Sequence, residues 1–183
     1  MSSPLRKFLT IITLVAGLVW IWYSRVTPLP EGTGESSAPH PGFLAPDFEL
    51  SGSDGAIYRL SDLRGKPVII NFWASWCAPC KAEMPAIERV HQGGKDQGLV
   101  VLAISATNQD NQADALAFLQ RIGIGFPILF DKDGNVFRLY GVRALPTTFF
   151  VDTRGVIQDV VVGGPMSEAL LRIRAMKIME AKP

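Results

Sequence analysis

The fold is decided by the stretch Asn71-Phe72-Trp73-Ala74-Ser75-Trp76-Cys77-Ala78-Pro79-Cys80-Lys81-Ala82-Glu83-Met84-Pro85, which holds both cysteines of the 183-residue chain. An apolar run begins before it at Val68 and ends at Trp73, which predicts a buried strand that leads into a helix. Cys77 would then lie exposed at the first turn of that helix, where unpaired N–H groups and the helix dipole favour a thiolate over a thiol. Because thiolates attack disulfides, the stretch predicts redox chemistry.

Composition points to one packed domain with appendages. The chain is 48% hydrophobic and carries a formal net charge of +1 without a long basic block. A core of ordinary size is therefore expected, and nucleic-acid binding is not.

The first 25 residues are predicted to be a membrane anchor. Residues 8–23 carry no charge and consist mostly of aliphatic and aromatic side chains. Arg6 and Lys7 on one side outnumber Arg25 on the other, so the positive-inside rule keeps the N-terminus cytoplasmic and places the rest outside the cell membrane. A cleaved secretory signal is the alternative, and both possibilities export the domain to the periplasm or the outer side of the membrane.

A Pro/Gly/Ser-rich linker is expected over residues 26–42, and a globular domain over 43–183. Apolar runs and turn signals alternate in the domain as in an α/β protein. The first two runs, 47–50 and 57–60, predict a β-hairpin. Further strands are expected at 68–73, 99–105, 127–130, 148–152 and 157–162, and helices at 77–91, 112–122 and 167–180. Thr153-Arg154-Gly155 would join the last two strands as an antiparallel hairpin, which makes the sheet mixed.

The redox stretch resembles the active site of the thioredoxin superfamily. Ala45-Pro46-Asp47-Phe48, the segment 60–66, the strand-helix unit 99–122 and Leu145-Pro146-Thr147-Thr148-Phe149 resemble its membrane-anchored, extracytoplasmic TlpA/ResA-like branch. The resemblance covers about residues 43–183. It implies a thioredoxin-like α/β fold, with a central mixed sheet flanked by helices, an N-terminal β-hairpin extension and an inserted strand-helix unit. The activity it implies is that of a thiol-disulfide oxidoreductase.

The two cysteines would carry out thiol–disulfide exchange. Cys77 attacks a partner disulfide, and Cys80, one helical turn deeper, resolves the mixed disulfide in an intramolecular step. Glu83 lies on the same side of the helix as Cys80 and is the candidate proton shuttle. Asn71 takes the position of the buried Asp of ordinary thioredoxins and cannot take up a proton. The alternative for Glu83 is a solvated carboxylate at the helix start.

Trp76, Leu145, Pro146 and Thr147 are the candidate substrate-binding residues. The family places a cis proline opposite the cysteines, where the preceding backbone pairs with an incoming chain, and this implies a cis bond before Pro146. A proline that opens an edge strand is the other interpretation. Trp76 is either a partner surface beside Cys77 or part of the core.

Electron flow is expected to make the protein a reductant. Strong oxidants of the superfamily carry His before the second Cys, whereas this chain carries Pro79, which favours a reductant. A disulfide oxidase or isomerase is the alternative. The resemblance implies a membrane dithiol electron donor (DsbD/CcdA-like). The proteins that receive electrons from this chain would be exported disulfide proteins, such as apocytochrome c with an oxidised CxxCH or a copper-centre assembly protein. No cofactor or metal is expected.

Other functions are weighed against this one. Zinc needs about four ligands, whereas the chain offers two Cys and two His, with His40 in the linker. A purely structural disulfide would close too small a loop to stabilise the fold much. A thiol peroxidase shares the Ala-Pro-Asp-Phe opening but has a different context before its cysteine. A non-catalytic partner-binding module remains a further alternative.

Overall fold

The computed structural model describes residues 4–26 and 36–181, which belong to two compact units, 1–31 and 32–183. In the first unit, helix α1 (Pro4–Val26) exposes apolar side chains that include Phe8, Leu14 and Trp20. Within the described residues, no helix is both long and apolar enough to cross a membrane. Most of the expected linker, residues 27–35, lies outside the described residues, so the linker stays a prediction.

The second unit is built on a mixed five-stranded sheet with the order β5-β4-β3-β6-β7. Strands β3 (Val68–Trp73), β4 (Val100–Ser105) and β5 (Ile128–Phe130) run parallel to one another. Strands β6 (Thr147–Val151) and β7 (Ile157–Val162) are antiparallel to their neighbours. This arrangement confirms the predicted mixed sheet, and it places β3 at the centre, between a parallel and an antiparallel partner.

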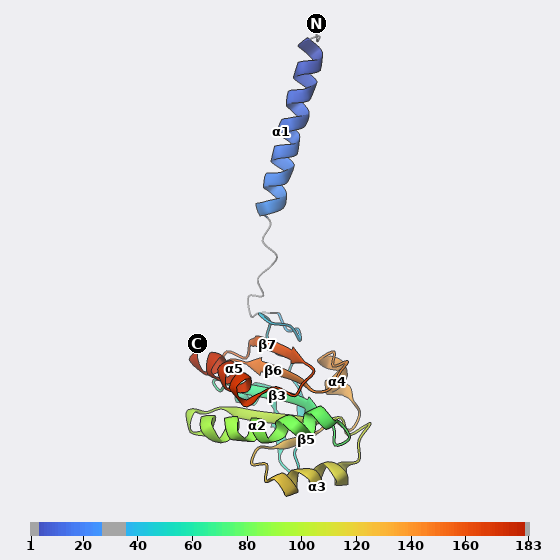
Figure 1. Cartoon of the computed structure of the whole chain (residues 1–183), viewed down its shortest axis with the longest axis vertical. Helices are drawn as coiled ribbons and strands as arrows, with labels where there is room; N and C mark the ends of the chain where they lie inside the picture. The colour runs from blue at the N-terminus through green and yellow to red at the C-terminus, as the bar shows by residue number, and fades with distance from the viewer. Residues whose placement is uncertain (1–3, 27–35, 182–183) are drawn as a thin grey trace. The chain divides into compact units, whose positions relative to one another are not determined.

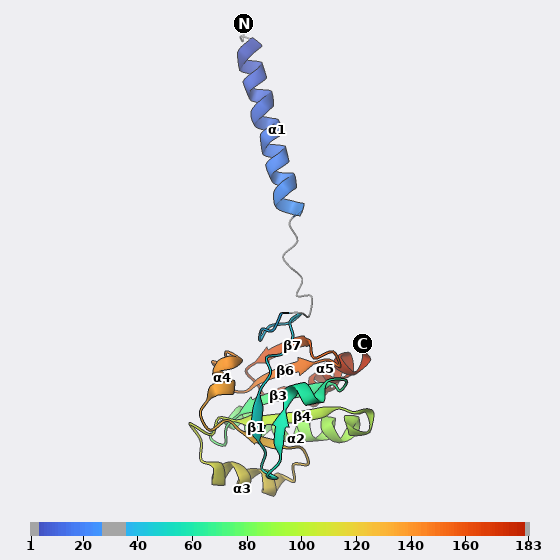
Figure 2. The same ribbon diagram turned by 180° about the vertical axis from the view of Figure 1, so that it is seen from behind.

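Helices cover both faces of the sheet, as Figures 1 and 2 show. Ile69 and Trp73 of β3 face an apolar cluster shared with α2 (Ala78–Gly94), α3 (Gln112–Ile122) and α5 (Glu168–Glu180). Ile70 and Phe72 face the opposite cluster, which includes residues of α4 (Asn135–Leu139) and of the 3-10 helix η1 (Leu60–Leu63). The alternation of β3 side chains thus serves two cores, which explains its unbroken apolar sequence.

The expected N-terminal hairpin is present. Strands β1 (Glu49–Ser51) and β2 (Ile57–Arg59) pair antiparallel, and the Ser53 N–H donates to the Ile128 carbonyl of β5 at 2.8 Å. The turn of the hairpin therefore reaches β5, while Leu50 and Tyr58 pack against the cluster on the Ile70 and Phe72 face. Figure 2 shows the hairpin crossing in front of that face of the sheet.

Most element boundaries agree with the predicted ones to within three residues, and α4 is the main element that was not predicted. It has only five residues, begins after Gly134 at φ +66° and buries Val136. A single helical turn is too short to produce a periodic apolar pattern. The short 3-10 helix η2 (Lys95–Gln97) after α2 was not predicted either.

The chain just before the hairpin is bound to the sheet at β7. The Gly42 N–H donates to the Ile157 carbonyl at 2.8 Å, and the Ile157 N–H donates to the Phe43 carbonyl at 2.9 Å. Leu44 pairs with Val156, just before β7, and also forms a bridge with Ser37 inside the same segment. Residues 42–44 thus pair with the start of the outer edge of β7.

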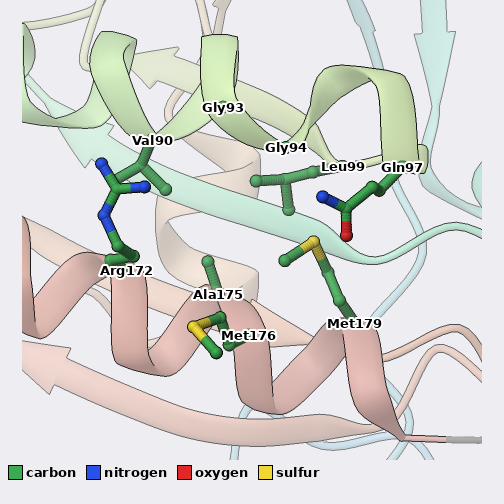
Figure 3. A pocket seen from close by; sticks show the side chains of 9 residues that line it. All are labelled: Val90, Gly93, Gly94, Gln97, Leu99, Arg172, Ala175, Met176 and Met179. Carbon is green, nitrogen blue, oxygen red and sulfur yellow. The ribbon is translucent and has the colours of Figure 1, made fainter.

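A hollow of about 220 Å³ lies between α2 and α5 (Figure 3). Val90, Leu99, Met176 and Met179 give it a largely apolar lining, and Arg172 lies at its rim. Val90 belongs to the C-terminal half of α2, whereas the cysteines lie at the N-terminal end. This hollow is therefore separate from the redox motif.

Candidate active site

Strand β3 carries the redox motif to the end of the sheet. All six of its residues are buried, and the Trp73 carbonyl accepts the Ala106 N–H at 3.0 Å, so the strand is held on its β4 side up to its last residue and on its β6 side up to Phe72. The chain then turns through Ala74, whose carbonyl accepts the Cys77 N–H at 3.1 Å. The first cysteine is therefore positioned by a rigid element.

Cys77 is the N-cap of α2, with φ −80° and ψ 101°, and forms a disulfide with Cys80 at a Cα–Cα distance of 5.3 Å. Its Sγ accepts the Cys80 N–H at 3.3 Å, which is one of the N–H groups that a helix start leaves without an intrahelical partner. Pro79 lies in the first turn, where a missing N–H costs no hydrogen bond. The prediction that Cys77 lies at the helix start is confirmed.

The expectation that Cys77 is exposed is wrong for this oxidised state. Cys77 is 4% exposed and Cys80 is fully buried. Both belong to the apolar cluster on the α2 and α5 face, which also includes Met166 and the partly buried Leu145. The covering residues come from distant parts of the chain.

Glu83 is buried in α2 one helical turn beyond Cys80, with 1% of its surface exposed. Its Oε1 accepts the Asn71 amide N–H at 2.9 Å, and its Oε2 accepts the Met166 backbone N–H at 3.1 Å. Burial raises the pKa of Glu83, while the hydrogen bonds from Met166 and Asn71 oppose that rise. The alternative of a solvated carboxylate is thereby excluded.

Gly164 closes the site over this carboxyl group. A Cβ atom placed on Gly164 would lie 2.8 Å from Pro146 Cγ and 2.9 Å from Glu83 Oε2, so only glycine fits without displacing a neighbour. The bond between Gly164 and Pro165 is cis, as is the bond between Leu145 and Pro146. The loop after β7 and the loop before β6 thus meet at Glu83.

The Leu145-Pro146-Thr147 segment has the cis bond that the resemblance implied. The Pro146 carbonyl accepts the Gly163 N–H at 2.7 Å, and the Thr147 hydroxyl donates to the Ala144 carbonyl at 2.8 Å. Thr147 is 3% exposed, so its side chain is not available to a partner. Within the described residues, the backbone N–H and carbonyl of Leu145 make no hydrogen bond.

Trp76 lies on the surface next to Cys77 and is 57% exposed. Its indole Nε1–H donates to the Gln109 carbonyl at 3.0 Å. The neighbouring Ser75 N–H donates to Asp110 Oδ2 at 2.6 Å. Gln109 and Asp110 belong to the loop between β4 and α3, so the inserted strand-helix unit supports the redox motif directly.

Sequence reasoning missed several residues around the disulfide. They are Asn71 as a hydrogen-bond donor, Thr148, Gly164, Met166 and Asp110. Asn71 faces Thr148 in the β3–β6 pairing, and this register is not visible in the sequence. Only the Gly163-Gly164-Pro165 run at the end of the last strand is a signal that could have been read.

Metal-binding groups are not gathered at this site. Throughout the described part of the chain, His, Cys, Asp and Glu side chains form no group of three that could hold a metal ion.

Comparison with known proteins agrees with this geometry. The model of the AhpC/TSA family matches residues 41–160. The thiol-disulfide oxidoreductase ResA of Geobacillus thermodenitrificans is 39% identical over 129 residues, which are 70% of this chain and 73% of that protein. The thioredoxin-like protein YneN of Bacillus subtilis is 38% identical over 163 residues, 87% of this chain and 91% of YneN.

Solved structures show the same architecture. A protein assigned as thiol:disulfide interchange protein DsbE from Chlorobium tepidum superposes with a TM-score of 0.70 at 34% identity, covering 76% of this chain and 98% of that one. The exposed lipoprotein thioredoxin Etrx1 of Streptococcus pneumoniae superposes with a TM-score of 0.63 at 33% identity, and the match covers 72% of this chain and 99% of the Etrx1 chain.

The sheet, the cis-proline loop and a CxxC disulfide at a helix start define a thioredoxin-like thiol-disulfide oxidoreductase. The chain belongs to the AhpC/TSA family, and its relatives there include the ResA proteins.

Proposed function

We propose that this protein reduces disulfides of exported proteins through the Cys77/Cys80 dithiol, with Glu83 as the proton carrier. The observation that carries the proposal is the buried Glu83 carboxyl group, one helical turn beyond Cys80, whose disulfide with Cys77 lies at the N-terminus of α2. Desolvation raises the pKa of that carboxyl group toward neutral pH, which is the direction that a proton carrier requires.

The reduction takes place in two exchange steps. The Cys77 thiolate attacks one sulfur of the partner disulfide, forms a mixed disulfide and releases the other partner sulfur as a thiolate. The Cys80 thiol then gives its proton to Glu83, and the Cys80 thiolate attacks the Cys77 sulfur. The Cys77–Cys80 bond forms, and the second partner sulfur leaves as a thiolate that takes up a proton. Two electrons pass from the dithiol to the partner.

Partner binding is proposed at Trp76 and the Leu145-Pro146-Thr147 loop. The exposed indole offers an apolar surface, and the Leu145 backbone groups are available to an extended chain. Since the Thr147 hydroxyl donates to Ala144 and its backbone pairs with Phe72 and Val162, we propose that Thr147 only holds the preceding Pro146 in place.

Reduction is favoured over oxidation because Pro79 offers no hydrogen bond to stabilise the Cys77 thiolate, and thus the reduced form. A reductant of this kind needs a donor. We propose a membrane dithiol carrier of the DsbD/CcdA-like kind, with apocytochrome c or a copper-centre assembly protein among the recipients.

Attachment of residues 1–25 to the cell membrane, with the catalytic domain on its outer side, belongs to the same proposal. The apolar side chains that α1 exposes and the basic residues Arg6 and Lys7 support it. Extraction of cell membranes with alkaline carbonate tests it, because a membrane-embedded chain stays in the pellet, whereas a peripheral or cleaved chain is released. Intact mass of the pelleted protein shows whether the first 25 residues are retained.

The reduction potential of the full chain in detergent micelles tests the direction of electron flow. Equilibration in graded thiol/disulfide buffers, followed by thiol trapping, gives the fraction of reduced Cys77/Cys80. A potential near or below about −230 mV supports the reductant, and a potential near about −120 mV makes the protein an oxidant instead. Peroxide consumption by the reduced chain would point to the thiol peroxidase alternative.

A further inference from the structure

Asn71 has an unusual hydrogen-bonding state beside Glu83. The residue is fully buried, and its Nδ2 donates to two acceptors, Glu83 Oε1 at 2.9 Å and Thr148 Oγ1 at 2.9 Å. Its Oδ1 is buried and has no hydrogen-bond partner in the described part of the chain. Buried amide oxygens are nearly always paired, so an idle acceptor next to a proton-carrying group requires an explanation.

The two oxygens of Glu83 are held by donors of different kinds. Oε2 accepts from the Met166 backbone N–H, which is fixed in direction and can only donate. Oε1 accepts from the Asn71 amide group, whose two ends are a donor and an acceptor of nearly equal size. Of the two groups that hold the carboxyl oxygens, only Asn71 can exchange donation for acceptance by turning.

Protonation changes what Oε1 requires. An ionised Glu83 accepts from Nδ2, whereas a proton on Oε1 would point at a nitrogen that is itself a donor. A half-turn of the amide group about its Cβ–Cγ bond brings the idle Oδ1 to that position. There it accepts from the Glu83 hydroxyl and from the Thr148 hydroxyl, which can donate as well as accept.

Other charges do not account for the site. The causes of the raised Glu83 pKa are burial, opposed by Met166 and Asn71, and no charged side chain contributes. Strand β3 presents Asn71 to the carboxyl group, and the loops on either side present Pro146, Gly164 and Met166, none of which titrates. On α2 itself, Cys80 lies one turn before Glu83 and titrates once the disulfide is reduced.

We propose that Asn71 is a positioning residue whose side-chain amide reverses when Glu83 gains a proton, so that Glu83 is hydrogen-bonded both as carboxylate and as acid. This inference rests on the proposed proton transfer between Cys80 and Glu83. The proton that leaves the Cys80 thiol gives the Glu83 acid, the amide turns, and the return of the proton to solvent or to a thiolate reverses the turn. Glu83 Oε1 then has a hydrogen-bond partner at this buried position both before and after it takes up the proton.

The direct test is NMR of the reduced full-length chain in detergent micelles, with labels on the Glu83 carboxyl carbon and the Asn71 side-chain amide. We expect the Asn71 Nδ2 proton signals to move upfield as pH falls, with the same midpoint as the Glu83 carbon, because those protons lose their acceptors. In Glu83→Gln the Asn71 signals should not change with pH. Asn71 signals that stay constant while Glu83 titrates would overturn the inference.

A kinetic test uses the mixed disulfide of Cys77 with 5-thio-2-nitrobenzoate, whose coloured thiolate is released when Cys80 resolves it. Asn71→Leu should raise the pH midpoint of the resolution rate, because the charge-assisted bond that the Glu83 carboxylate loses is stronger than the bond that the Glu83 acid loses. It should slow resolution less than the roughly 10²-fold expected of Glu83→Gln. Thr148→Val, which removes a hydroxyl that serves both amide orientations, should leave the midpoint nearly unchanged. A merely structural Asn71 would lower stability in Asn71→Leu without moving the midpoint, and that result would refute the inference.

The same data separate this inference from the proposed function. If Glu83→Gln resolves the mixed disulfide as fast as the native chain, the proton role of Glu83 fails, and this inference fails with it. If Glu83→Gln is slow but the Asn71 signals ignore the titration of Glu83, only the amide reversal fails. Should Asn71→Leu not fold, Asn71→Ser, whose hydroxyl can also donate or accept, should keep a midpoint nearer to that of the native chain.

Discussion

Asp110 holds Ser75 at both of its carboxylate oxygens, one through the Ser75 backbone N–H and one through its hydroxyl. The loop between β4 and α3 is thereby bound to the residue just before Trp76. Asp110→Ala should lower the free energy of unfolding by about 1.5–3 kcal/mol, the range for hydrogen bonds to a charged group. It should also loosen the Trp76 side chain, which fluorescence anisotropy would report.

Asp133→Ala is the matched control for that variant. It removes the same charge from an exposed carboxylate that makes no hydrogen bond within the described residues. Its unfolding free energy should stay within about 0.5 kcal/mol of the native value. Equal losses in the two variants would mean that the bond between Asp110 and Ser75 contributes nothing measurable.

Single cysteine substitutions should separate the two exchange steps. Cys80→Ser should accumulate a mixed disulfide with a partner, because the resolving thiol is gone, while Cys77→Ser should form little or none. Nonreducing gels of the two variants after incubation with a disulfide protein would measure this. Equal adduct formation by both variants would contradict the assignment of Cys77 as the attacking thiol.

The stability difference between the oxidised native chain and Glu83→Gln should depend on pH. Burial raises the pKa of Glu83 from its ordinary value of 4.5, so above that pH the unfolded carboxyl group ionises while the folded one still holds its proton. The native chain therefore loses stability relative to Glu83→Gln as pH rises from the ordinary pKa through the raised pKa of the folded state. Above the raised pKa the difference stays constant. Urea unfolding of both proteins across this range gives the difference, and a difference that grows in the opposite direction would mean that the folded pKa is lowered.

Gly164→Ala should destabilise the protein by about 1–3 kcal/mol, since its methyl group would overpack against Pro146 and Glu83. It should also slow resolution of the mixed disulfide, because the carboxyl group must move. Gly93→Ala in α2 is the control. The nearest atom to its added Cβ, Arg172 Nη1, is 3.6 Å away, so helix propensity should make it neutral or stabilising by up to about 1 kcal/mol. Thermal unfolding of both variants measures the contrast.

The order of strands and helices could be read from the sequence because each central element is long enough to show its pattern. The apolar run of β3 and the start of α2 at the cysteines are local features, and they were predicted closely. Helix α4 was missed because one turn has no period. The burial of Cys77 depends on the tertiary packing of its apolar cluster, to which the distant Met166 and Leu145 contribute.

The hydrogen-bonded environment of Glu83 could be predicted only in part for a related reason. Its place beside Cys80 follows from helical spacing, which is local. Its contact with Asn71 needs the packing of α2 on β3, and the contact of Asn71 with Thr148 needs the register of β3 against β6. Register between distant strands is set by the whole sheet, so no short motif contains it.

The pairing of residues 42–44 with the start of β7 decides how a pull on the N-terminal segment would act on the molecule. Leu44 meets the sheet at Val156, just beyond Val151, which lies opposite Val68, whereas the cysteines follow Trp73 at the other end of β3. A six-residue strand separates these two ends by about 17 Å. Mechanical load from the N-terminal segment would therefore enter at the edge strand and peel that edge first, while the geometry around the disulfide, at the far end of the central strand, stays unloaded.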